Sequence, residues 1–253
     1  MQSDFPDFEV LANHKDLGRL QASAILALGK KLGRPLSIVE AGCGRFWKLD
    51  LTGVDYTLTG VDLDPVALEL RETVARDLDV AICGDLCTVD LPAASADVVY
   101  SRYVLEHVQR ADVAIQNFVK WLKPGGLMIL HIPGRETARG FYTRLLPHWC
   151  HQWFYRYVMG DKLAGQQGHP PHRTYFHPVI GGERLCGFLA ENGMKCLSRH
   201  GAGFPRRVSL DKGLGVVVQQ LVVKATSILT LGKLTAAYHD VSYIAVKNAP
   251  DPN

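Results

Sequence analysis

The sequence predicts an α/β fold built around a mostly parallel sheet. Short runs rich in β-branched residues alternate with runs of helical periodicity along the first half of the chain. The run at 127–132 is almost wholly apolar, which is typical of a parallel strand buried on both faces. The chain has 253 residues, of which 47% are hydrophobic and 21% charged, so it can bury a sizeable core.

The elements alternate regularly in the first half of the chain. Across residues 13–31 apolar side chains recur at steps of three and four, and Gly33-Arg34-Pro35 ends that helix. Pro65 opens a second helix at a position that proline favours. A third helix begins near Ala111 and is closed by Lys123-Pro124-Gly125-Gly126. Strands are expected at 36–40, 56–61, 80–82, 97–100 and 127–132, with a short helix at 46–52.

The alternation breaks after Pro133. Residues 135–177 hold nine of the chain's 22 aromatic residues, five histidines, six Arg or Lys and two acidic side chains. A second irregular region spans 201–239. One domain over residues 1–253 with these two insertions accounts for the pattern. The elements expected around the second insertion are a helix at 183–191, a strand at 195–199 and a last strand at 241–246.

Charge and cysteine usage exclude some classes of protein. A net charge of +3 is too small to indicate a nucleic-acid-binding protein. The first thirty residues show no signal-peptide pattern. Six cysteines without a CxxC spacing favour reduced thiols, so we expect a cytoplasmic protein.

Three features converge on one edge of the predicted sheet. Gly42 and Gly44 form a turn after the first strand, where the backbone can bend sharply and a ligand can approach closely. Asp62 lies 20 residues beyond the first glycine, at the end of the second strand, a spacing that suits hydrogen bonds to ribose hydroxyls. Asp85 follows the third strand and could accept a hydrogen bond from an exocyclic amine such as that of adenine.

A nicotinamide-binding domain would share this geometry. Its GxGxxG fingerprint would place a third glycine at Trp47, and Glu40 at the end of the first strand is foreign to it. An acid in that place could instead receive the ammonium group of an amino-acid moiety. NAD-dependent oxidoreduction is therefore the weaker alternative.

At this point the motifs resemble a known family. Residues 40–44 (EAGCG), 60–65 (GVDLDP) and 84–86 (GDL) look like the successive cofactor motifs of class I S-adenosylmethionine-dependent methyltransferases. Residues 96–108 are similar to the fourth-strand motif of the small-molecule branch that includes quinone-biosynthesis methyltransferases, and 122–130 match the turn before the family's fifth strand. The resemblance covers about residues 36–132.

The resemblance implies a Rossmann-like sheet of seven strands, mostly parallel, with helices on both faces and an antiparallel last strand. It also implies S-adenosyl-L-methionine as cofactor: the glycines approach the methionine part, Asp62 holds the ribose, Asp85 and Leu86 flank adenine, and Ser101 lines the methyl-transfer site. The chain departs from the family pattern at Arg45 and Phe46. The cofactor-binding set is expected to be Glu40, Gly42, Gly44, Asp62, Leu63, Asp85, Leu86 and Ser101.

A sulfonium methyl group is already electrophilic, so alignment of the acceptor carries most of the chemistry. A base is needed only for a neutral hydroxyl or a carbon acid. His107 and His131 are the candidates, and packing without proton transfer is the alternative for each. The histidines of the first insertion, such as His148 and His172, lack a metal-site spacing, so no metal is expected.

The insertions suggest an acceptor. Aromatic and arginine side chains at 135–177 could form a lid over a small or lipid-like, anionic aromatic acceptor, or could form a satellite core. Residues 214–234 form an amphipathic stripe with cations nearby, which suits a helix on an anionic membrane surface; packing on the insertion or in a homodimer is the alternative. A non-catalytic module of the same fold, serving as a cofactor-binding or partner protein, is the main rival to an enzyme.

Overall fold

The computed structural model describes residues 6–158, 160–166, 171–203 and 214–249. Its centre is an eight-stranded sheet in the order β1-β7-β8-β6-β5-β2-β3-β4. All neighbouring strands are parallel except that β8 runs against both β6 and β7. The Rossmann-like fold class with an antiparallel last strand is therefore confirmed. The strands are β1 (Phe8–Leu11), β2 (Leu36–Ala41), β3 (Tyr56–Asp62), β4 (Val80–Cys83), β5 (Ala96–Arg102), β6 (Leu122–Pro133), β7 (Met194–Gly203) and β8 (Tyr238–Lys247).

The eighth strand is an addition to the seven that the resemblance implies. β1 pairs in parallel with the far end of β7, from Arg199 to Ala202. That pairing is available because β7 continues to Gly203, beyond the expected 195–199. A four-residue edge strand carries too short a pattern for the sequence to reveal.

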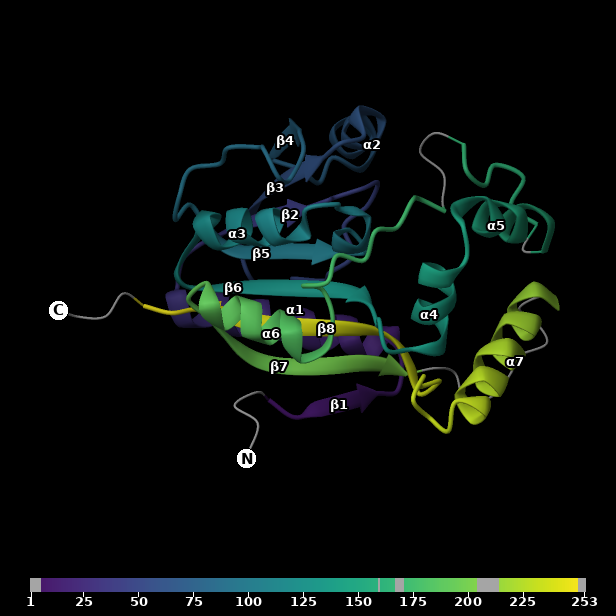
Figure 1. Ribbon diagram of the computed structural model, residues 1–253. Helices are drawn as coiled ribbons and strands as arrows, with labels where there is room; N and C mark the ends of the chain where they lie inside the picture. Colours follow the sequence, from purple (N-terminus) through teal and green to yellow (C-terminus); the bar gives the residue numbers. More distant parts are fainter. Residues whose placement is uncertain (1–5, 159, 167–170, 204–213, 250–253) are drawn as a thin grey trace.

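Helices cover both faces of the sheet. Figure 1 shows α3 and α6 in front of it and α1 behind. α1 begins where the Asn13 side chain accepts hydrogen bonds from two backbone amides, and ends at Gly33, whose φ is 61°. One apolar core lies under α3 and α6, around Trp121 and Phe118, and a second lies under α1. The helices are α1 (His14–Leu32), α2 (Pro65–Leu70), α3 (Ala111–Trp121), α4 (Ala138–Leu145), α5 (His148–Trp153), α6 (Gly182–Glu191) and α7 (Leu214–Leu229).

The short helix expected at 46–52 does not form, and that prediction was wrong. Leu49 and Leu51 are both buried in the core beneath α1. Residues two apart point in different directions on a helix but to the same side of an extended chain. The Asp50 carboxylate also accepts hydrogen bonds from the Thr52 amide and hydroxyl, a local turn that competes with helix formation.

The two insertions lie together. α4 and α5 come from the first insertion and α7 from the second, and Figure 1 shows all three beyond the carboxyl ends of β5 and β6. α4 and α7 pack against each other, with the Tyr142 and Thr226 hydroxyls 2.7 Å apart. α7 ends at Leu229, short of the expected 234, because the chain turns through Leu231 and Gly232 at positive φ. Residues 204–213 of the second insertion lie outside the described part.

Candidate functional site

The turn after β2 requires glycine for two separate reasons. Gly42 has a φ of +75°, and a Cβ there would collide with a methyl group of Val104. Gly44 has a φ of +56°, and a Cβ there would meet nothing within 4 Å. Gly42 therefore lets Val104 approach, whereas Gly44 leaves open space for a ligand. Trp47, where a nicotinamide fingerprint needs glycine, instead packs against Tyr56 and Tyr100.

Asp62 connects the turn with the end of β3. Its Oδ2 accepts from the Gly44 amide at 2.8 Å and its Oδ1 accepts from the Asp64 amide at 2.9 Å. A carboxylate has about four acceptor sites, so two remain for a ligand. Asp64 has a different task, because its Oδ1 accepts from the Val66 amide and caps α2.

Glu40 is held by a residue that the sequence did not single out. The Arg71 guanidinium, fully buried, donates to Glu40 Oε2 at 2.9 Å, to the Cys43 carbonyl at 2.9 Å and to Asp77 at 2.6 Å. Burial raises the pKa of Glu40, and the Arg71 charge opposes that shift. Glu40 still lines the cavity beside the turn, but much of its charge is committed to Arg71.

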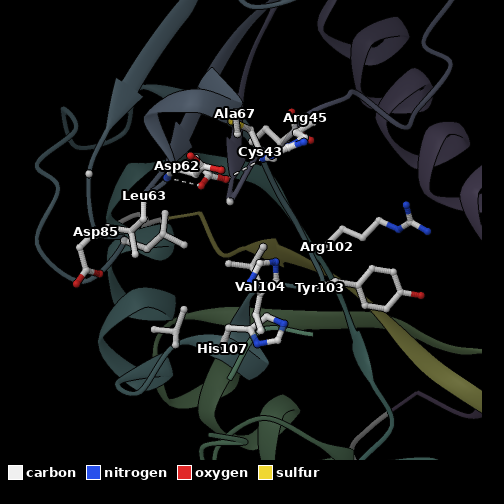
Figure 2. Close-up of a pocket in the computed structure, with 18 of the residues that line it drawn as sticks. Cys43, Arg45, Asp62, Leu63, Ala67, Asp85, Arg102, Tyr103, Val104 and His107 are labelled. Carbon is white, nitrogen blue, oxygen red and sulfur yellow. Dashed lines mark hydrogen bonds between the residues drawn. The ribbon is translucent and has the colours of Figure 1, made fainter. Parts of the chain in front are cut away.

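These residues surround a cavity of about 740 Å³. Asp85 lies at one end of it, and Val104 and His107 lie on the wall facing Asp62 (Figure 2). Leu86 also lines the cavity. The volume suits a nucleoside-sized ligand. Together with the open space at Gly44 and the free acceptor sites of Asp62, it fits the cofactor that the motifs imply. Seven of the eight expected cofactor residues line this cavity: Glu40, Gly42, Gly44, Asp62, Leu63, Asp85 and Leu86.

Two expected site residues lie elsewhere. Ser101 is buried in β5, and its hydroxyl has no hydrogen-bond partner among the described residues. Its neighbours Tyr100 and Arg102 line the cavity instead. His131 is buried in β6 and lines neither this cavity nor the next. The structure therefore gives His131 no direct access to an acceptor.

A second cavity of about 730 Å³ adjoins the first. Its wall comes from α4, α5, the segment 171–176 and α7, together with Glu106 and Asp240. Tyr103, His107 and His172 line both cavities, so they mark the junction. Both insertions thus contribute to one enclosure next to the expected cofactor site.

The residues at the junction carry polar groups of defined orientation. His107 Nδ1 lies 2.8 Å from the Arg173 carbonyl, which can only accept. Nδ1 therefore carries the proton, and the lone pair of the neutral ring is on Nε2. Burial lowers the pKa of His107, so the neutral ring prevails near pH 7. Burial also raises the pKa of the adjacent Glu106 to about 8.

Tyr103 is the junction residue that sequence reasoning missed. Its φ is +56°, which is costly for a non-glycine residue. Its hydroxyl donates to Asp240 Oδ2 at 2.7 Å. It stands within the 96–108 motif, next to the fourth strand's end, and that position is the signal that could have identified it.

A family model described as "Methyltransferase domain" matches residues 39–130. Among curated proteins, phosphoethanolamine N-methyltransferase 1 of Triticum aestivum is 29% identical over 100 residues, 37% of this chain and 20% of the relative. The chain thus spans about a fifth of the length of such plant relatives.

A longer match is to malonyl-[acyl-carrier protein] O-methyltransferase of Methylovorus sp., which is 25% identical over 219 residues, 81% of this chain and 73% of the relative. Among solved structures, magnesium protoporphyrin IX methyltransferase from Synechocystis PCC 6803, with bound SAH, superposes with a TM-score of 0.52 at 15% identity. That match covers 92% of this chain and 84% of the other. At such identity it supports the fold alone.

Proposed function

We propose that this chain, whose residues 39–130 match a methyltransferase-domain family model, binds S-adenosylmethionine and transfers the methyl group of that cofactor to a small, amphiphilic acceptor. The observation that carries the proposal is the pair of adjoining cavities. One holds the cofactor motif residues, and the other is walled by the two insertions. When bound, S-adenosylmethionine supplies an electrophilic methyl group.

The protein's own part is to align the acceptor and remove a proton where the acceptor is neutral. His107 is the residue placed for proton removal, because it lies at the junction with its Nε2 lone pair available. Tyr103, anchored on Asp240, fixes the same junction from the side of β8. The segment 171–176 closes it, since the Tyr175 amide donates to the Glu106 carbonyl at 2.8 Å. Closure excludes water from the reacting groups.

Methyl transfer is tested with methyl-labelled cofactor and a cell extract of lipids and small molecules. We expect label to enter an extractable compound with the wild-type protein and not with the Asp62→Ala variant. Calorimetry with S-adenosylmethionine and NAD, in parallel, reports binding independently of turnover. Tight cofactor binding with no labelled product would favour a non-catalytic module, and preference for NAD would favour oxidoreduction.

The burial pattern of α7 bears on the nature of the acceptor. Gln220 is 5% exposed and Thr226 8%, whereas Leu221 is 55% exposed and Ile228 75%. A helix in water normally buries its apolar side chains and exposes its polar ones. In α7 the polar Gln220 and Thr226 face inward and the apolar Leu221 and Ile228 face outward. The outer face of this helix therefore suits an apolar environment.

The helices around the second cavity also share one sign of charge. α4, α5 and α7 contain no Asp or Glu, whereas Arg139, Arg144 and Lys224 lie on them. The exposed aromatic residues Trp149 and Trp153 lie on α5. Tryptophan and basic residues beside aliphatic ones are what a peripheral contact with an anionic bilayer requires.

We therefore assign the acceptor to lipid-like molecules that enter the second cavity from a membrane surface. The binding is peripheral in this proposal. Within the described part of the chain, no helix has the length and apolar character to cross a bilayer. A second copy of this chain covering the same face is the alternative, and binding to anionic vesicles distinguishes the two.

A further inference from the structure

Three residues far apart in the sequence meet beside the second cavity. His14 opens α1, His131 lies in β6 and Asp240 in β8. One ligand atom of each lies within 4.8 Å of the others. Asp240 Oδ2 is 3.4 Å from His14 Nε2 and 4.0 Å from His131 Nε2. Asp240 Oδ2 also accepts from the Tyr103 hydroxyl at 2.7 Å, whereas His14 and His131 have no part in the proposed methyl transfer.

His131 supplies a second, independent observation. Its side chain is 2% exposed, and its Nε2 has no hydrogen-bond partner among the described residues. A buried polar atom without a partner is costly. Here that atom points at the carboxylate without reaching hydrogen-bond distance, which leaves room between them.

Gln21 provides the support that a ligating histidine needs. Its side-chain amide lies 3.3 Å from His131 Nδ1 and 2.8 Å from the Ser242 hydroxyl. As placed, Gln21 Nε2 donates to the Ser242 hydroxyl, and Gln21 Oε1 accepts from the Tyr100 hydroxyl at 3.5 Å. With the amide rotated by 180°, Gln21 would accept from His131 Nδ1–H and from the Ser242 hydroxyl, and the lone pair of His131 would lie on Nε2. The two orientations of an amide are not distinguished by atom positions alone. Such an outer partner fixes the ligating tautomer.

We propose that His14, His131 and Asp240 bind a divalent transition-metal ion of the zinc class. Two imidazoles and a carboxylate are ligands that suit zinc. Bonds of about 2.0–2.2 Å place tetrahedral ligand atoms roughly 3.3–3.6 Å apart. Binding therefore requires His131 Nε2 to move closer to Asp240 Oδ2 than 4.0 Å, and the two imidazoles, whose ligand atoms lie within 4.8 Å, to approach each other.

The surroundings define the character of the site. The charges of Arg102 and Arg139 act on Asp240 and weaken its attraction for a cation. The side chain of His14 is 43% exposed, so an ion can enter, and three protein ligands leave a position for an oxygen ligand. Because Asp240 lines the second cavity, that position lies at its wall. The proposal does not depend on methyl transfer.

Cobalt(II) is the probe, because its visible absorption reports the coordination of the ion. Tag-free, full-length protein freed of metal by a chelator is titrated with Co²⁺, and then with Zn²⁺ as competitor. We expect one Co²⁺ per chain, displacement by Zn²⁺, and at least about tenfold weaker binding in the His14→Ala and Asp240→Asn variants. His177→Ala, outside the cluster, is the matched control.

His14 is the decisive position: because its side chain is 43% exposed, we expect the His14→Ala variant to keep the fold, and circular dichroism checks this. Absence of a visible band in the wild type at about 1 mM Co²⁺ would overturn the proposal. Binding by His14→Ala within twofold of the wild type would overturn it as well. Neither result would bear on whether the protein binds S-adenosylmethionine, which is measured separately.

Discussion

Asp62 and Asp64 stand two residues apart and face different tasks. Asp62 keeps acceptor sites open toward the first cavity, whereas Asp64 caps α2. A carboxylate that meets two ribose hydroxyls contributes a few kcal/mol, and about 1.4 kcal/mol is tenfold in affinity. We expect Asp62→Ala to weaken S-adenosylmethionine binding about tenfold or more, and Asp64→Ala to weaken it much less, as measured by calorimetry. Equal losses in the two variants would contradict the assignment of Asp62 to the ribose.

The position of His107 leads to a prediction about how the rate of methyl transfer depends on pH. A base works in its neutral form, and burial lowers the pKa of His107, so the rate should stay level through pH 7 and fall only below the ordinary histidine pKa of about 6.5. The His107→Gln variant should lose about a hundredfold or more in kcat, together with this acid limb, while cofactor affinity stays within a few-fold. The measurement is kcat/KM against pH with the acceptor found in the extract. His172→Gln, which removes the other junction imidazole, should retain the acid limb. An unchanged limb in His107→Gln would exclude His107 as the base.

Site residues could be predicted from the sequence where the order of strands along the chain alone determines their position. Asp62 and Asp85 follow parallel strands, so the sheet brings them to one cavity whatever the side chains do. Ser101 does not line the cavity, because strand alternation turns it away while Tyr100 and Arg102 face the cavity. Arg71 could not be anticipated, since its partners lie 31, 28 and 6 residues away and only the folded chain assembles them.

At the scale of elements, the start of β5 is held by a buried carboxylate. Asp97 accepts from Arg34 at 2.6 Å, from the Ser37 amide at 2.9 Å and from Lys123 at 3.0 Å. Burial alone would raise the pKa of Asp97, but these bonds outweigh it and hold the pKa at about 2. Because the pKa of Asp97 is lower in the folded protein than the value of about 3.8 in the unfolded chain, this carboxylate stabilises the fold at any pH above about 3.8. That stabilisation is lost as the pH falls toward 2.

We expect Asp97→Asn to lower the free energy of unfolding by about 1–2 kcal/mol at pH 7, a range that allows for solvent screening of the half-exposed Arg34. The difference in the free energy of unfolding between the wild type and the variant should become smaller below pH 4. Urea unfolding between pH 7 and pH 3 measures it. Asp90→Asn, which removes an exposed partner of Lys120, should leave the pH dependence almost unchanged. If the difference in the free energy of unfolding stayed constant down to pH 3, the charge of Asp97 would not be the cause of the stabilisation.

Elements with strong periodic signals were predictable, and those defined by distant partners were not. The long helix α1 has both a cap residue and a terminating glycine within its own sequence. β1 depends on the extension of β7, whose paired residues lie 191 positions later in the chain, and no local sequence pattern signals this pairing. The stretch 46–52 has helix-compatible residues, yet the buried Leu49 and Leu51 hold it extended. Tertiary burial overrides weak local preference in such short segments.

For the whole molecule, the carboxyl edge of the sheet carries three features at once. The first cavity, the second cavity and the apolar face of α7 all lie there, whereas the two ends of the described chain lie on the opposite side or beneath it (Figure 1). Docking through this edge would bring a lipid acceptor next to the junction without removing the protein from the surface. In the membrane proposal, the acceptor would therefore come from the surface that α7 contacts.

Leu221, Ala225 and Ile228 share the outer face of α7, whereas Val218 lines the second cavity. A substitution at Val218 would disturb the cavity as well as the surface, so the outer face is the sharper target. Immersing a leucine or isoleucine side chain contributes about 1.5–3 kcal/mol. We therefore expect Leu221→Glu/Ile228→Glu to reduce binding to anionic vesicles at least tenfold, as measured by co-sedimentation.

Wild-type binding should weaken with salt, because screening reduces the attraction of the basic residues for anionic lipids. Val74→Glu/Val80→Glu is the matched control: it adds the same two charges at exposed apolar positions that line neither cavity, and should keep vesicle binding. Both double variants should bind S-adenosylmethionine like the wild type. Absence of vesicle binding at low salt would contradict the membrane proposal. If the wild type then sedimented as a dimer that only the α7 variant dissociates, a second copy of this chain would be the partner of that face.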